Sequence, residues 1–151
     1  MATQHYTHTD YYTASLTRYA DLTHLKTNRN SAIFSVYTAG VTIECMFRAY
    51  ITKYTKEFDS KHDLEKLYTK SLLGSQFDTD EKERLTIAVK KANNIWSNDL
   101  RYASEKRMKR IIAHKNIRAN LNDVNAFINR EYNAIFDATE LIIEKGKEKW
   151  T

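Results

Sequence analysis

A single carboxylate stands in the most apolar stretch of this sequence. Glu44 lies within residues 39–51, where most of the other side chains are apolar or small. Burying a carboxylate is costly unless a positive charge compensates it. On a helix, Arg48 lies one turn further on at i+4, and Arg101 is the long-range alternative because it follows a helix expected to pack nearby. Glu44 is therefore either half of a structural ion pair or a functional acid.

A second polar pair, His62 and Asp63, comes where a short helix is expected to begin. Ser60 and Asp63 have the spacing of a capping box, and either side chain can accept hydrogen bonds from the free N–H groups of a first helical turn. Capping explains the acid without any chemistry. A structural role is the first interpretation of this pair, and a role in a functional site is the alternative.

The positive charge of the chain is concentrated in residues 101–118. This segment holds seven basic residues and one acid, so its net charge is +6, whereas the rest of the chain sums to −1 and the whole chain to +5. Clustered Lys and Arg side chains bind phosphate backbones with little sequence readout. The side chains expected to bind RNA or another polyanion are Lys106, Lys109, Arg110, Lys115 and Arg118. An acidic protein partner and a solvated helix without a specific role are the alternatives.

Several other chemistries are excluded by composition. Cys45 is the only cysteine, so there is no internal disulfide and no cysteine-based metal site, as is usual in the cytosol. We expect it to be an inert buried thiol. A glycine-rich phosphate loop is absent, which excludes P-loop and Rossmann nucleotide sites. The histidines lack the carboxylate clusters of a two-metal nuclease. We therefore expect no metal and no cofactor.

Helices are expected to carry all of these residues. The 151 residues include no proline and only three glycines, whereas a β-rich fold needs many tight turns. Apolar spacing near 3.6 residues predicts the helices. The first helix is capped by Thr9 or Asp10 and ends near Leu25, and the second covers about Ser31–Glu57. A short third helix is stopped by Gly74. The fourth helix is opened by Asp78 and broken at Ser97–Asp99, and the last covers about Asn120–Lys147.

The second helix is predicted to be the buried centre, because apolar side chains such as Phe34 and Tyr37 surround most of it. Gly40 within it predicts the close approach of a neighbouring helix. We expect an all-α, up-and-down bundle of four main helices plus one or two short helices. Residues 1–151 would form one domain with a flexible N-terminus over 1–8 and a basic insertion over 101–118. No apolar run reaches the roughly 20 residues that cross a bilayer, so no membrane association and a cytoplasmic location are expected.

Three motifs on this frame resemble the HEPN family. They are Ala39-Gly-Val-Thr-Ile-Glu44-Cys-Met-Phe-Arg48-Ala-Tyr50, then Lys61-His62-Asp63-Leu64, then Asp99-Leu-Arg101-Tyr102. With the long last helix, the resemblance covers about residues 9–148. It implies an all-α, often dimeric bundle of the toxin–antitoxin or phage-defence type. The residues that correspond to the family's polar network are Glu44, Arg48, His62, Asp63, Arg101 and Tyr102.

The resemblance also implies a candidate catalytic pair. Many HEPN proteins are metal-independent endoribonucleases that carry an Arg, four to six further residues, and then a His. Arg107 and His114 have this spacing and lie between the Arg-Tyr motif and the last helix. The His would act as acid–base, and the Arg would stabilise charge on the reacting phosphate. Arg18 and His24 match the spacing too, but in the first helix.

Two classes of function stay open at this stage. In one, the protein is an endoribonuclease acting on RNA or nucleotides, with two sites near the axis of a homodimer. In the other, it is a non-catalytic accessory subunit that docks a minimal nucleotidyltransferase or holds a nucleic acid on its basic segment. Most of the ten tyrosines are expected in the core or at a dimer surface.

Overall fold

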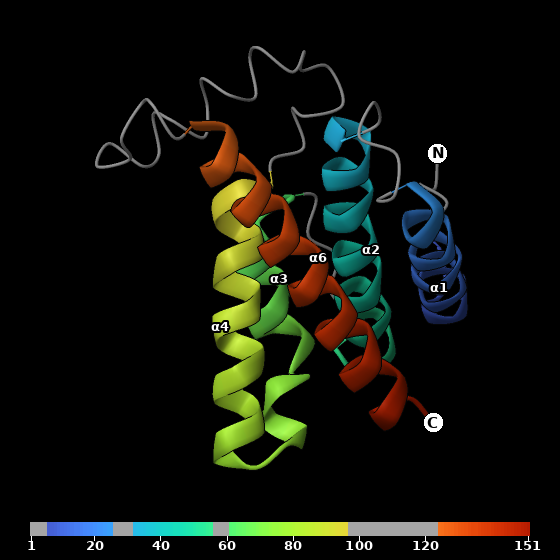
Figure 1. Ribbon diagram of the computed structural model, residues 1–151. Coiled ribbons are helices and arrows are strands. Elements are labelled where there is room, and N and C mark those ends of the chain that lie inside the picture. Colours follow the sequence, from blue (N-terminus) through green and yellow to red (C-terminus); the bar gives the residue numbers. More distant parts are fainter. Residues whose placement is uncertain (1–5, 26–31, 56–60, 97–123) are drawn as a thin grey trace.

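The computed structural model describes residues 6–25, 32–55, 61–96 and 124–151 (Figure 1). Every regular element in these ranges is a helix. The elements are α1 (His8–Leu25), α2 (Ala32–Tyr54), α3 (Leu64–Ser71), the 3-10 helix η2 (Gly74–Gln76), α4 (Thr79–Ile95) and α6 (Val124–Lys149). The predicted all-α fold is confirmed for this part of the chain.

Helix α2 is the centre of the bundle, as its apolar sequence predicted. It packs against α1, α3 and α6, while α4 packs against α6 and α3. Its fully buried side chains include Val36, Ile43, Met46, Phe47 and Tyr50. Helices α1, α3, α4 and α6 add residues to the same core, so the described helices share one hydrophobic interior.

The long helices alternate in direction along the chain. The Ser15 hydroxyl of α1 donates to the Thr42 carbonyl of α2 at 2.8 Å. The end of α1 meets the start of α2, so these two helices are antiparallel. Lys145, near the end of α6, contacts Glu81, in the first turn of α4, at 3.1 Å. With α2 and α6 descending in Figure 1 and α4 ascending, the order is up-and-down.

Two helix starts follow the predicted capping. The Asp78 side chain accepts a hydrogen bond from the N–H of Glu81 at 2.9 Å at the start of α4. The Asp63 side chain does the same for Lys66 at 3.1 Å at the start of α3. Each carboxylate satisfies one N–H that the helix itself leaves unpaired and lies at its positive end.

The start of α1 differs from the prediction. Helix α1 begins at His8, so Thr9 and Asp10 lie inside it rather than at its cap. The Thr7 hydroxyl accepts from the Asp10 N–H at 3.1 Å, and the Thr7 N–H donates to the Asp10 carboxylate at 2.9 Å. This reciprocal pair is a capping box in which Asp10 is the second member. The N-terminal stretch predicted over 1–8 overlaps this helix start at Thr7 and His8.

The end of α3 also differs from the prediction, because Gly74 does not stop this helix. Leu72 ends α3 with φ 60° in the left-handed region that usually favours glycine. Gly74 instead begins η2 with a negative φ. A Cβ added at Gly74 would lie 2.2 Å from the Tyr68 hydroxyl oxygen. Glycine is needed there because the Tyr68 side chain approaches the backbone.

A close approach at Gly40 is present, but the neighbour is the Trp96 side chain rather than a helix packed along α2. This residue ends α4 and lays its indole on Gly40, where a Cβ would lie 2.0 Å from two ring atoms. The indole Nε1–H donates to the Tyr37 carbonyl at 3.1 Å. One tryptophan thus fixes the end of α4 against the first half of α2.

A second tryptophan fixes the opposite end of the bundle. The Trp150 ring stacks on Tyr12 of α1 with centroids 4.4 Å apart and planes 7° apart. It meets Tyr50 of α2 edge-on at 5.3 Å, and the Lys53 ammonium lies 4.4 Å from its centroid. Aromatic pairs and cation–π contacts of this kind stabilise beyond the area that they bury. They hold α1, α2 and the residue after α6 together.

The contact between Gly40 and Trp96 generates a prediction about stability. We expect Gly40→Ala to lower the free energy of unfolding by about 1–3 kcal/mol, because the indole must move. Gly146→Ala is the matched control. A Cβ at Gly146 would meet the flexible Met46 side chain, with the Sδ at 2.6 Å, and methionine adapts more easily. Urea unfolding followed by circular dichroism measures both. An equal or smaller loss for Gly40→Ala would contradict this account.

Candidate functional site

The polar residues of α2 form an ion pair within the bundle. Glu44 Oε2 lies 3.3 Å from Arg48 Nε, one helical turn further on. The two side chains are only 13% and 10% exposed, so water screens them little. Arg48 is the local one of the two partners expected for Glu44, and Arg101, the long-range one, lies outside the described residues.

The chain before α3 completes this cluster. His62 Nδ1 lies 2.7 Å from Glu44 Oε1, and Arg48 Nη2 donates to the Lys61 carbonyl at 2.9 Å. Asp63, the next residue, caps α3. The histidine is the most open member, with its side chain 43% exposed. We call Glu44, Arg48 and His62 the polar cluster.

The arrangement of the polar cluster suits a structural tie. Both Glu44 oxygens have partners, one in α2 and the other before α3, so the carboxylate is already engaged on both sides. The contacts join residues 18 positions apart and fix where α3 starts on α2. Charge-assisted hydrogen bonds are the strong ones at such partly buried positions. Each Glu44 oxygen thus has one protein contact in this cluster.

The remaining predicted site residues lie outside the described part of the chain. They are Arg101 and Tyr102 of the polar network, the pair Arg107 and His114, and the basic residues Lys106, Lys109, Arg110, Lys115 and Arg118. Of the predicted polar network, the structure brings together Glu44 and Arg48 of α2 with His62, which lies just before α3.

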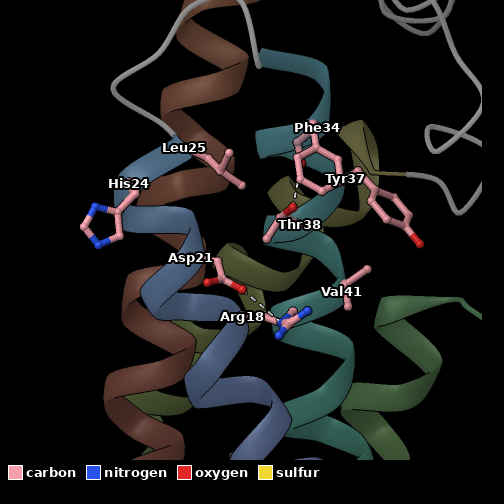
Figure 2. A pocket seen from close by; sticks show the side chains of 8 residues that line it. All are labelled: Arg18, Asp21, His24, Leu25, Phe34, Tyr37, Thr38 and Val41. Atoms are coloured by element: carbon pink, nitrogen blue, oxygen red, sulfur yellow. Dashed lines mark hydrogen bonds and ion pairs between the residues drawn. The ribbon is translucent and has the colours of Figure 1, made fainter.

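A groove of about 490 Å³ lies between α1 and α2 (Figure 2). We call it the α1–α2 groove. It is lined mainly by apolar side chains, with three ionisable ones on the α1 side. The lining residues are Arg18, Asp21, His24, Leu25, Phe34, Tyr37, Thr38 and Val41.

The α1 side of this groove carries an ion pair. Arg18 Nε lies 3.3 Å from an Asp21 oxygen, and the side chains are 48% and 51% exposed. Figure 2 shows the Arg18 guanidinium directed toward α2, whereas the His24 ring points away from it. Arg18 and His24, which share the Arg–His spacing noted in the sequence, are thus not brought together.

The α2 side of this groove is aromatic and was missed at the sequence level. Phe34 is 56% exposed, and its ring centroid lies 6.4 Å from that of Tyr37. Both were expected to help bury α2. Phe34, Tyr37 and Val41 follow one another at i, i+3 and i+7, so they form one stripe on the helix. This spacing was visible in the sequence, but a stripe that faces the core has the same spacing as one that lines a groove.

Cys45 lies beside the polar cluster, and its surroundings make it unreactive. Burial raises the pKa of its thiol to about 11, the Glu44 charge adds to this effect, and the Arg48 and Arg18 charges oppose it. The thiolate is the nucleophile of cysteine chemistry, and at neutral pH little of it forms here. The expectation of an inert thiol agrees with this environment.

Within the described ranges, no group of three His, Cys, Asp or Glu side chains is placed to hold a metal ion. None of the helices in this part of the chain combines the length and the apolarity that a membrane span requires.

Comparisons of the chain with models of known protein families, with curated protein sequences and with solved structures found no match. The case for function therefore depends on the residues and their geometry.

The polar cluster generates a prediction about stability. Glu44→Gln removes the charge that Arg48 faces in a partly buried site, so we expect a loss of about 1.5–3 kcal/mol in the free energy of unfolding. Glu81→Gln is the matched control, because Glu81 also pairs with two cations but its side chain is 29% exposed. We expect it to cost less than about 1 kcal/mol. Equal losses in urea unfolding would show that burial of the cluster contributes nothing.

The environment of Cys45 generates a prediction about reactivity. With its pKa near 11 instead of 9.0, the thiolate fraction at pH 8 falls on the order of a hundredfold. We expect iodoacetamide to alkylate the folded protein at least that much more slowly than the same chain in urea, with the rate still rising above pH 9. Mass spectrometry measures the rate. Comparable rates in the folded and unfolded chains would refute the raised pKa.

Proposed function

We propose that this protein is a HEPN-like helical bundle that acts on RNA or nucleotides in a toxin–antitoxin or defence system. One observation carries the proposal. Two motifs that resemble this family, one with Glu44 and Arg48 and one with His62, are separate in sequence but meet in the polar cluster. Unrelated matches to two short patterns have no reason to converge. Their contact supports treating the motifs as one network, with Arg101 and Tyr102 as its remaining members.

The charge distribution supports a polyanionic ligand for this bundle. Residues 101–118 carry +6 in a chain whose other residues sum to −1. Phosphate contacts from such a segment give affinity that falls with salt and depends little on sequence. In the enzymatic form of the proposal, His114 transfers the proton and Arg107 stabilises charge on the scissile phosphate, without a metal or cofactor.

A second candidate is a non-catalytic accessory subunit, and exposed apolar side chains favour it. Leu72 and Ile87 are 50% and 46% exposed, and each lines a different groove of the surface. Exposed apolar side chains beside a groove are typical of docking surfaces. The partners proposed in this case are a minimal nucleotidyltransferase or a nucleic acid. Both candidates include a homodimer and a cytoplasmic location.

RNA cleavage in EDTA separates the two candidates. We expect the wild-type protein to cut a mixed-sequence RNA without divalent metal, and His114→Ala to lower the rate at least about a hundredfold by removing the acid–base. His24→Ala is the matched control, since His24 shares the Arg–His spacing but lies in α1. It should cleave like the wild type. Gel electrophoresis of labelled RNA gives the rates.

Each outcome of this experiment decides between the candidates. Cleavage that persists in His114→Ala would refute the assigned catalytic pair. RNA binding that weakens with salt, without any cleavage by the folded wild type, would favour the accessory subunit. Neither cleavage nor salt-dependent binding of RNA by the folded wild type would overturn the proposed action on RNA.

A further inference from the structure

We propose that the α1–α2 groove is the surface through which two copies of this chain pair. The apolar side chains of each copy would cover the groove of the other, and Arg18 of one copy would contact Asp21 of the partner subunit. The inference rests on the proposed function only in taking a second copy as partner. It adds the surface, the symmetry and the residues in contact.

The first argument is the exposed apolar stripe of α2. Phe34 is 56% exposed although α2 is the central helix, and with Tyr37 and Val41 it lines an open groove of about 490 Å³. Leu25 of α1 lines the same groove from the other helix (Figure 2). A second apolar surface of matching shape would remove these side chains from water.

The second argument is the register between α1 and α2, which fixes where the charges lie. The two helices are antiparallel, and Ser15 faces Thr42. Because both helices rise by about 1.5 Å per residue, Arg18 lies near the level of Ala39 and Asp21 near the level of Val36. Along the helix axis, the Arg18 charge and the Asp21 charge therefore lie on opposite sides of the point midway between Tyr37 and Thr38.

A two-fold axis that crosses both helices at right angles at this point, in the plane between the two copies, makes the groove complementary to itself. It exchanges the levels of Phe34 and Val41, so each large aromatic side chain would meet the smaller aliphatic one of the other copy. The same axis exchanges the levels of Arg18 and Asp21, so each cation would meet an anion. In a two-fold interface every such contact occurs twice. One symmetry operation thus satisfies both the apolar and the charged residues.

The charge balance favours a second copy over other occupants. The groove has one Arg and one Asp that already contact each other, so a strongly anionic ligand would face Asp21 and a strongly cationic one would face Arg18. The groove between α4 and α6 differs, because Arg84, Lys91 and Arg130 line it with a single acid. Two copies meeting there would bring like charges together.

The test uses charge reversals and equilibrium sedimentation. We expect the wild type to be dimeric. Arg18→Glu would place an acid opposite Asp21 of the partner subunit twice, and Asp21→Arg would place two cations opposite each other twice. Each variant alone should weaken the dimer by about a hundredfold or more. An equimolar mixture of the two variants should recover it, because every contact across the interface again joins opposite charges.

This recovery distinguishes pairing between copies from a local effect on α1, since mixing leaves each chain unchanged. Arg84→Glu is the matched control, because Arg84 also pairs with an acid three residues away, at 3.2 Å, and is exposed. It should stay dimeric. Thermal unfolding by circular dichroism confirms that the variants are folded.

The outcomes separate this inference from the proposed function. A dimer that both variants leave unchanged, or a mixture that stays monomeric, would overturn the α1–α2 groove as the interface but leave action on RNA standing. A monomeric wild type would overturn the inference and the proposed homodimer together. RNA cleavage and binding are measured separately, so action on RNA is tested whichever of the three results sedimentation gives.

Discussion

The fold depends on the burial of α2, which packs against three neighbouring helices at once. Contacts with α1, α3 and α6 leave little of its surface to water, so each polar or irregular position needs a local solution. At Gly40 the solution is a missing side chain, which admits the Trp96 indole. At Glu44 it is the Arg48 charge together with the contact to His62 Nδ1, since an unpaired carboxylate there would be costly. Because the buried Glu44 needs a partner from outside α2, the polar cluster lies where the start of α3 packs against α2.

Much of the helical frame could be predicted, because it depends on local chemistry. The apolar spacing of α2 and the cap at Asp78 each follow from neighbouring residues and are present. The errors arose where tertiary contacts decided. The sequence predicts Gly74 as the stop of α3, but Leu72 has the left-handed conformation, and the glycine makes room for Tyr68.

The candidate site was predictable to a smaller extent. The contact between Glu44 and Arg48 follows from their spacing on one helix. The approach of His62 required the path of the chain from α2 to α3, which no local pattern contains. Phe34 and Tyr37 were expected to help bury α2, because apolar side chains at a core and at a groove have the same helical spacing. The basic segment 101–118 remains a prediction from composition and order.

The aromatic contacts of Trp150 have a consequence for how the molecule opens. Helix α1 has only two fully buried residues among its 18, and Tyr12, Leu16 and Tyr19 pack against the core while partly exposed. The stack of Trp150 on Tyr12 couples it to the last turn of α6, although these elements are almost the whole chain apart. If the end of α6 frays, Tyr12 loses this ring, so opening at the C-terminal end of the described chain removes a contact from the first helix.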